Sequence, residues 1–180
     1  STAALMVDAG RNQWVQVAAL AYSDTAPVPA IEGPVRPLPM TMDHALDLKN
    51  AQREEIVMEG GAMGSMRGAR LNGVESDFRQ LIAGDMENPA FRAPRGRTVH
   101  VTLRNDTSWP HGIHLHGHHF EILTRNGQPD AYRDRRDTVF VAPEEVVEIA
   151  FNADNPGKWL LHCHMLGHQV AGMRTWFEVG

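Results

Sequence analysis

The chain has little of several features that would each indicate a particular class of protein. It contains one cysteine among 180 residues, so no internal disulfide can form and cysteine counting assigns no redox compartment. The formal net charge is −5, and the Lys and Arg residues are scattered, which excludes a basic surface for nucleic acid. No apolar run approaches the roughly 20 residues that span a bilayer. Neither nucleic acid nor a membrane is therefore an expected partner.

The chain divides by composition into three parts. Residues 13–22 cluster Val, Ala and Leu like a strand, with no preceding element expected to pair with it. Five prolines between residues 27 and 39 resist both helix and sheet and favour an extended spacer. We therefore predict the end of a preceding domain at 1–26, a proline-rich linker at 27–40 and a carboxy-terminal domain at 41–180. The first ten residues also lack the charged start and apolar core of an export signal.

Short strand signals dominate the third part. The stretch 58–73 is rich in Gly and Met, has no regular period and is expected to be a loop. Beyond it, short segments rich in β-branched and aromatic residues alternate with turn formers such as Asn126-Gly127. We predict strands at 99–103, 120–124, 138–141, 146–151, 159–162 and 174–179. This spacing predicts an all-β fold, an antiparallel sandwich or barrel.

The single cysteine lies in an unusual string of metal-binding residues at 162–173, which reads HCHMLGHQVAGM. Cys163, His168 and Met173 supply a thiolate, an imidazole and a thioether, and blue-copper sites combine these ligands with a second imidazole. His111 is the best candidate for that imidazole, because it stands slightly apart from the other upstream histidines and precedes a different strand. The string therefore predicts a copper site.

A second histidine-rich window lies upstream, so eight of the ten histidines fall into two short windows. On an extended strand, His162 and His164 point to one face while Cys163 points to the other. The same period places His114 and His116 together on one face. We therefore predict that four histidines from two strands converge on a second metal centre, which is joined covalently to the first through Cys163.

Both windows resemble the carboxy-terminal domain of the multicopper oxidases, the laccase family, including bacterial periplasmic members. The similarity in pattern extends from about residue 71 through 136–139 to residue 177. The resemblance implies a cupredoxin-like Greek-key β-sandwich or barrel, with residues 1–26 ending a preceding cupredoxin domain, and a periplasmic or secreted location. It implies a type 1 copper on His111, Cys163, His168 and Met173, a type 2 copper on His114, and paired type 3 coppers on His116, His162 and His164.

The resemblance also implies that this chain holds half of a trinuclear site. The family uses eight histidines there, four of them from two His-X-His motifs of the amino-terminal domain. This sequence has no further His-X-His outside the two windows. The amino-terminal part of the same protein, or another subunit, is therefore expected to supply four histidines, and the abrupt start at Ser1 favours the first. Gln169 and Val170 stand where the family often has acidic residues that relay protons.

The implied activity is that of a copper-dependent oxidase with four copper ions per complete enzyme. It would oxidise a phenol, an aromatic amine or a metal ion by single electrons at the type 1 copper and reduce O2 to water at the trinuclear centre. Cys163, His162 and His164 would be the catalytic residues, because they join the two sites. The alternative is a blue-copper electron-transfer or copper-handling module, which would not need the His162 and His164 pair. Nitrite reductases lack the His-Cys-His tripeptide, and a metal-free descendant would not keep all eight ligands.

Other residues have two interpretations each. His118 and His119 are expected to be supporting or strand residues rather than ligands, because the roles in that window are filled. Asp106 is a candidate for orienting a type 1 imidazole, although such positions are more often turns. The irregularly spaced methionines could form a cuprous-ion relay, but flexible loop and gap-filling core explain them better. These are Met40, Met42, Met58, Met63, Met66 and Met86.

Overall fold

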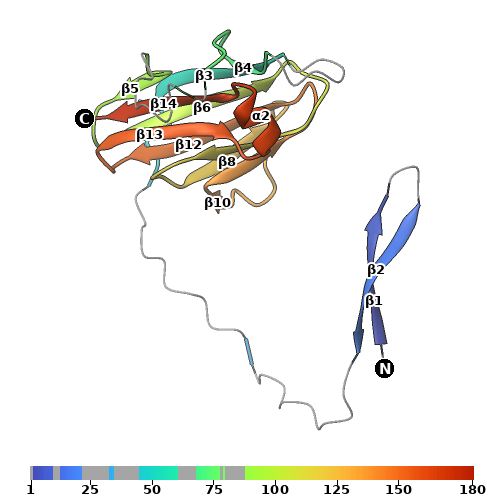
Figure 1. Cartoon of the computed structure of the whole chain (residues 1–180). Coiled ribbons are helices and arrows are strands. Elements are labelled where there is room, and N and C mark those ends of the chain that lie inside the picture. The colour runs from blue at the N-terminus through green and yellow to red at the C-terminus, as the bar shows by residue number, and fades with distance from the viewer. Residues whose placement is uncertain are drawn as a thin grey trace. The chain divides into compact units, whose positions relative to one another are not determined.

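The computed structural model describes residues 2–9, 13–21, 33–34, 45–60, 68–77, 79 and 88–180. The chain forms two compact units, Ser1–Met42 and Asp43–Gly180, and each is described here by itself (Figure 1). Most of the predicted linker at 27–40 lies outside the described residues. No helix in the described ranges has the length and apolarity to cross a membrane.

The first unit contains a two-stranded antiparallel hairpin. Strand β2 (Trp14–Ala21) confirms the strand predicted at 13–22. The expectation that nothing precedes it to pair with it was wrong, because β1 (Thr2–Asp8) forms an antiparallel ladder with β2. Two consecutive alanines in β1 weaken its strand signal, since alanine is depleted in strands. Apolar side chains of both strands are exposed within this unit.

The second unit is a sandwich of two β-sheets (Figure 1). The larger sheet has the order β10 (Arg135–Arg136), β8 (Phe120–Arg125), β12 (Val146–Ala153), β6 (Arg97–Asn105), β3 (Gln52–Glu59), β4 (Arg70–Leu71), with β9 (Gln128–Pro129) beside β8. The smaller sheet has the order β11 (Thr138–Val141), β7 (His111–Leu115), β13 (Gly157–Cys163), β14 (Arg174–Val179), β5 (Phe91–Ala93). The predicted all-β sandwich is confirmed, and the six predicted strands correspond to β6, β8, β11, β12, β13 and β14.

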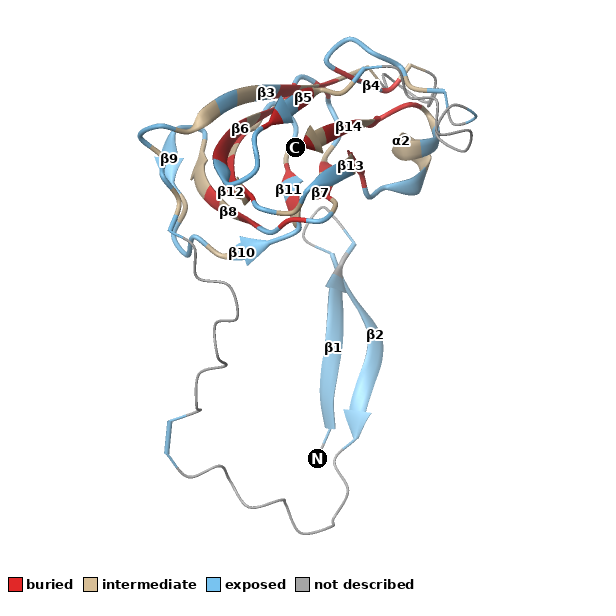
Figure 2. Cartoon of the chain, turned by 90° about the vertical axis from the view of Figure 1, so that its left-hand side faces the viewer, coloured by how far each residue is buried: buried red, intermediate tan, exposed pale blue. Residues whose placement is uncertain are grey.

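The core lies between the two sheets (Figure 2). Each central strand turns alternate residues inward, as Val99, Val101 and Leu103 of β6 show by their complete burial. Removing such side chains from water contributes roughly 1.5–3 kcal/mol each. Because alternate residues face opposite ways, the inner face of the smaller sheet packs into this core while its outer face carries a separate set of side chains. Both faces matter for the metal centres.

The sequence missed several elements that lack an apolar period. Strand β3 has the sequence QREEIVME, and its charged start does not suggest a strand. It pairs in parallel with β6, and Glu55 forms a 3.0 Å ion pair with Arg104 there. The predicted turn at Asn126-Gly127 is confirmed by φ angles of 48° and 74°. Met58 is buried in the core, as the gap-filling interpretation expects, and the other five methionines considered for a relay lie outside the described residues.

Candidate metal centres

Two adjacent strands of the smaller sheet, β7 and β13, carry residues of both predicted metal sites. They pair antiparallel, with His162 opposite His114 and Cys163 opposite Ile113. Directly opposite residues share a face of the sheet, and successive residues alternate between faces. Cys163 and Ile113 are therefore on the core side, and the two histidines are on the outer side. The predicted division of the His-Cys-His tripeptide between two faces is confirmed.

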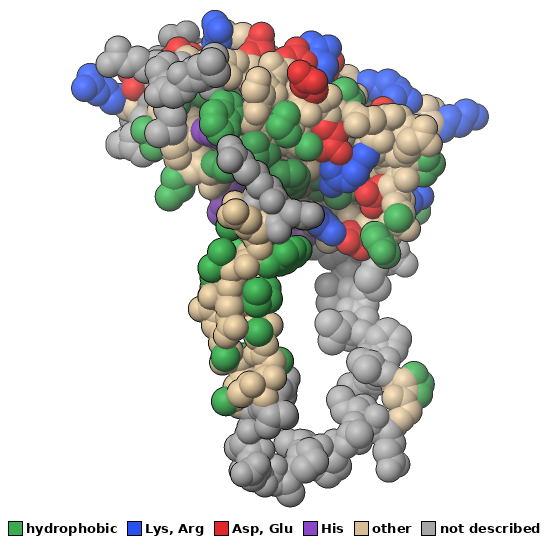
Figure 3. Space-filling model, turned by 90° about the vertical axis from the view of Figure 1, so that its right-hand side faces the viewer, with side chains coloured by type: hydrophobic (Ala, Val, Ile, Leu, Met, Phe, Trp, Pro, Cys, Tyr) green, Lys and Arg blue, Asp and Glu red, His purple; other side chains and the backbone are tan. Residues whose placement is uncertain are grey.

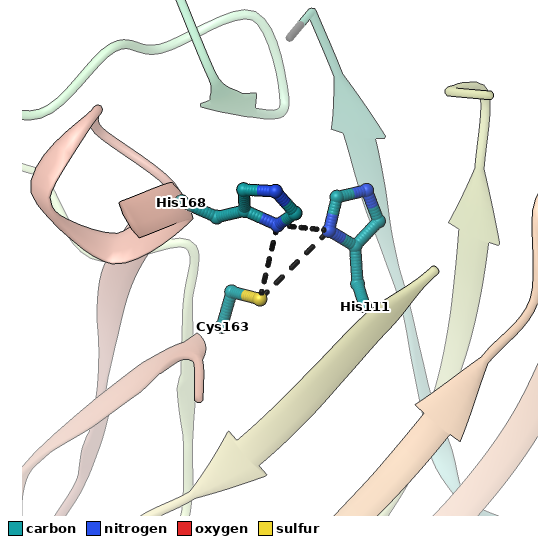
Figure 4. A group of neighbouring side chains, drawn as sticks. All are labelled: His111, Cys163 and His168. Atoms are coloured by element: carbon teal, nitrogen blue, oxygen red, sulfur yellow. Dashed lines mark hydrogen bonds between the residues drawn. The ribbon is translucent and has the colours of Figure 1, made fainter. Parts of the chain in front are cut away.

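His111, Cys163 and His168 form a cluster on the core side (Figure 4). The two Nδ1 atoms lie 3.0 Å apart, and the Cys163 Sγ atom lies 3.8 Å from His111 Nδ1 and 3.7 Å from His168 Nδ1. A metal ion about 2.0 Å from each nitrogen and about 2.3 Å from the sulfur fits inside such a triangle. The three donor atoms therefore suit one soft metal ion.

Met173 is tied to this cluster through the backbone. The Cys163 N–H donates to the Met173 carbonyl at 3.0 Å, and the Met173 N–H donates to the His168 carbonyl at 3.0 Å. The Met173 side chain is buried in the core. Two imidazoles, a thiolate and a neighbouring thioether are the ligand set of a type 1 copper site.

His168 comes from a short helix, α2 (Leu166–Val170), which lies between the strands predicted at 159–162 and 174–179 and was not itself predicted. The helix begins after Met165, whose carbonyl accepts hydrogen bonds from the His168 and Gln169 N–H groups at 2.9 and 3.0 Å. No side chain caps its first turn. One turn of helix brings His168 back over Cys163, five residues earlier.

His111 was expected to precede a strand, whereas it is the first residue of β7, the strand that also carries His114. The two histidines are three positions apart along the strand, an odd spacing that places them on opposite faces. Pro110 lacks an N–H donor, so the ladder cannot continue through it towards the amino terminus, and β7 begins at His111. As a result β7, like β13, contributes to both centres.

A hydrogen-bond network that the sequence did not indicate orients His111. Thr107 Oγ1 lies 2.7 Å from His111 Nε2 and donates its hydrogen to Asn105 Oδ1 at 2.7 Å, so it accepts from Nε2–H. The fully buried Asn105 amide donates to the carbonyls of Trp109 at 2.7 Å and Ala142 at 2.8 Å. This tautomer leaves His111 Nδ1 free for a metal ion. Asp106, the residue considered for this role, instead pairs with Arg104 at the surface.

Burial keeps the core-side donors neutral when no metal is bound. Burial, together with the charge of His168, lowers the pKa of His111 to about 4, and burial also lowers the pKa of His168. Burial raises the pKa of the Cys163 thiol. The imidazoles are therefore ready to bind a metal ion at neutral pH, whereas the thiol must lose its proton when the ion enters.

The outer face carries a second cluster, formed by His114, His116 and His162, whose donor nitrogens all lie within 4.8 Å of one another. His116 Nε2 lies 3.1 Å from His162 Nε2. The far nitrogens of two rings have partners: His114 Nδ1 donates to the Asp137 carbonyl at 2.8 Å, and His162 Nδ1 donates to the Cys163 carbonyl at 2.9 Å. These bonds leave both Nε2 atoms available to a metal ion.

His164 lies beside this cluster without belonging to its closest group. Its ring centre is 5.5 Å from that of His114 and 5.8 Å from that of His162. The side chain is exposed, and its backbone N–H donates to the Gly112 carbonyl at 2.6 Å. Histidine side chains reach the surface of this unit among hydrophobic ones, as Figure 3 shows. The assignment of individual histidines to type 2 and type 3 copper remains a prediction.

His118 packs rather than binds. It is buried, and its ring contacts those of Phe151, Trp159 and Phe177 at centre distances of 5.1–5.8 Å. It belongs to neither donor cluster found among the described residues.

Comparisons with known proteins agree with this geometry. A family model described as "Multicopper oxidase" matches residues 64–180. The chain belongs to the multicopper oxidase family. Multicopper oxidase MmcO of Mycobacterium tuberculosis is 49% identical over 108 residues, which cover 58% of this chain and 21% of that protein. Iron transport multicopper oxidase fio1 of Schizosaccharomyces pombe is 39% identical over 95 residues, covering 46% of this chain and 15% of that protein.

Solved structures of other proteins share the fold. The multicopper oxidase from Pseudomonas thermotolerans superposes with a TM-score of 0.68 at 27% identity, covering 81% of this chain and 33% of that one. Lac15 from a marine microbial metagenome gives 0.62 at 31% identity, covering 94% of this chain and 37% of that one. The chain thus contains the carboxy-terminal cupredoxin domain of this family, with a type 1 copper site and a histidine triad. It spans well under half the length of these relatives.

Proposed function

We propose that the chain is the part of a laccase-like oxidase that holds the type 1 copper and half of a trinuclear copper centre. The type 1 ligands are His111, Cys163, His168 and Met173, and the trinuclear ligands are His114, His116, His162 and His164. Bound copper would supply the one-electron oxidation of a phenol, an aromatic amine or a metal ion and the four-electron reduction of O2 to water.

One observation carries this proposal: the His-Cys-His tripeptide faces two donor clusters at once. Cys163 faces the cluster in the core, and its bonded neighbour His162 faces the cluster on the outer side of the same sheet. The His162 ring is bonded further to the cysteine, because its Nδ1 donates to the Cys163 carbonyl. A short covalent and hydrogen-bonded connection between the sites is what a protein that couples two redox reactions requires.

The outer cluster needs a partner, which we propose to be an amino-terminal domain of the same protein or another subunit. Three histidines with donors within 4.8 Å provide too few ligands to complete a three-copper centre. The rings project from the outer face of the smaller sheet, away from the core that closes its inner face. Four further histidines from a domain that packs on this outer face would complete the centre.

The hairpin β1–β2 supports a preceding cupredoxin domain. Leu5, Trp14 and Leu20 are 53%, 61% and 59% exposed in the hairpin. A two-stranded hairpin is marginally stable in water, so these side chains require further strands to cover them. The match to Lac15 covers 94% of the chain, which is more than the second unit alone can supply, so it includes residues of the first unit. By family resemblance we also propose a periplasmic or secreted location.

The alternative is a blue-copper electron-transfer or copper-handling module that uses only the core-side cluster. The outer cluster argues against it, because such a module has no use for three convergent histidines. Copper analysis and oxygen uptake of the protein together with its amino-terminal part distinguish the two. The proposal predicts four copper ions per complete molecule and oxygen consumption with a phenolic or dye donor. One copper ion and no oxygen consumption would establish the module instead.

A further inference from the structure

Arg174 is a buried arginine in the middle of the region that connects the two copper sites. Arg174 has no exposed surface and is the largest fully buried side chain among the described residues. In the ladder between β13 and β14 it lies directly opposite His162, so its side chain starts on the outer face, beside the trinuclear ligands. A guanidinium cannot lose its proton in a protein, so its burial is costly unless hydrogen bonds compensate.

The guanidinium donates to two backbone carbonyls from different parts of the chain. Nη1 donates to the Gln169 carbonyl in α2, one residue after His168. Nη2 donates to the Ser76 carbonyl, in a segment that is 98 residues away in sequence. The planar fork of arginine suits such a double contact.

The same two segments are joined by further bonds. Ser76 Oγ donates to the Arg174 carbonyl at 2.9 Å, and the Ser76 N–H donates to the Gly172 carbonyl at 3.4 Å. Gly172 has a φ of 117°, and a Cβ atom there would lie 2.6 Å from the Ala69 carbonyl oxygen. The loop that leads from α2 to Met173 is therefore pressed against residues 69–76, and the arginine crosses this contact.

Building on the proposed function, we propose that Arg174 is a positioning residue for the type 1 copper site. Its buried guanidinium bridges the carbonyls of Gln169 and Ser76. The bridge fixes α2 and thereby the distance of 3.7 Å between His168 Nδ1 and Cys163 Sγ. Both contacts that define the bridge are to backbone carbonyls. The arginine therefore acts on the copper site through the backbone of the loop and not through a metal ligand.

Amide hydrogen exchange of the metal-free chain tests the bridge without copper. In Arg174→Met, the protected amides of residues 168–173 should exchange roughly ten- to a hundredfold faster, the factor expected for loss of a charge-assisted hydrogen bond. The amides of β7 and β11 should keep their rates. Arg92→Met is the matched control, because Arg92 pairs with Glu178 at the surface of the same sheet and is 67% exposed. It should leave residues 168–173 unchanged.

The copper spectrum then tests the effect on the site. Copper-loaded Arg174→Met should show an altered ratio of the thiolate charge-transfer bands and an altered copper hyperfine splitting, whereas Arg92→Met should match the wild type. Wild-type exchange rates together with a wild-type spectrum in Arg174→Met would overturn the proposal. If Arg174→Met does not fold, Arg174→Lys is the test, because lysine keeps the positive charge but lacks the planar guanidinium that makes both contacts. Wild-type exchange rates at residues 168–173 in Arg174→Lys would overturn the proposed bridge, and faster exchange there would support it. A wild-type chain without a blue band would refute the proposed function alone, because the exchange result does not depend on copper.

Discussion

Replacing Thr107 by valine should weaken both the fold and the type 1 site. Valine keeps the shape of threonine and removes the hydroxyl, which lies 2.7 Å from His111 Nε2 and 2.7 Å from Asn105 Oδ1. Both partners are buried, at 2% and 0% exposure, so water does not replace the lost contact without rearrangement. Asn105 Oδ1 keeps the Thr107 N–H at 3.0 Å, but the Nε2–H of His111 is left without an acceptor.

The Trp109 N–H, which donates to the same hydroxyl at 3.2 Å, also loses its acceptor, and the magnitude follows mainly from the buried His111 donor. Leaving a buried polar group without its partner costs about 1–3 kcal/mol, so the free energy of unfolding of the metal-free chain should fall by about 2 kcal/mol in urea. Copper affinity should fall about 10- to 100-fold, because the hydroxyl also selects the tautomer that presents Nδ1 to the metal. The matched control is Thr102→Val, a half-buried threonine on the same strand as Asn105, which should change stability by less than about 0.5 kcal/mol. Equal unfolding energies and equal copper affinities for Thr107→Val and the wild type would refute the role assigned to this network.

Three further predictions follow from single features of the sites. Cys163→Ser should abolish the intense blue absorption while the outer histidines keep binding copper, as metal analysis and electron paramagnetic resonance would show; a blue variant would contradict the ligand set. Burial lowers the pKa of His111 from 6.5 to about 4, so between these pH values the unfolded chain binds more protons than the folded chain. The metal-free chain should therefore lose stability as the pH falls from 6.5 to about 4. Urea midpoints that stay constant across this range would contradict the lowered pKa of His111. Gly117→Ala should lower the free energy of unfolding in urea by roughly 2–5 kcal/mol, since the φ of Gly117 is 72° and the new Cβ would lie 2.4 Å from the Trp159 ring. The control Gly127→Ala has a φ of 74° and nothing within 4 Å of its Cβ, so it should cost distinctly less. Equal losses would exclude the ring contact as the cause.

The sequence predicts those parts of the fold that depend on local periodicity. Six strands of the sandwich have alternating β-branched and aromatic residues, and all six are present in the structure. The tripeptide His162-Cys163-His164 could be divided between two faces from alternation alone. That His114 and His162 share one face followed from the same rule, because both lie on paired strands, whereas His168 comes from α2.

The sequence does not predict parts that depend on contacts between distant segments. Helix α2 has five residues and no side-chain cap, so it has no local signal. The role of Thr107 depends on Asn105, whose amide reaches carbonyls 36 and 37 residues further along the chain. The bridge from Arg174 to Ser76 spans 98 residues. An isolated arginine after a metal-binding string does not reveal that its side chain is buried, since that depends on which segment covers it.

Titration of copper(II) into this chain tests the central claim most directly, because all four proposed type 1 ligands are present here while the trinuclear ligands are only half complete. The thiolate-to-copper charge-transfer absorption should rise in proportion to added copper and saturate at one copper ion per chain. Further copper should bind weakly, without adding to the blue absorption. A chain that binds copper tightly without developing the blue band would contradict a type 1 site built from Cys163, His111, His168 and Met173.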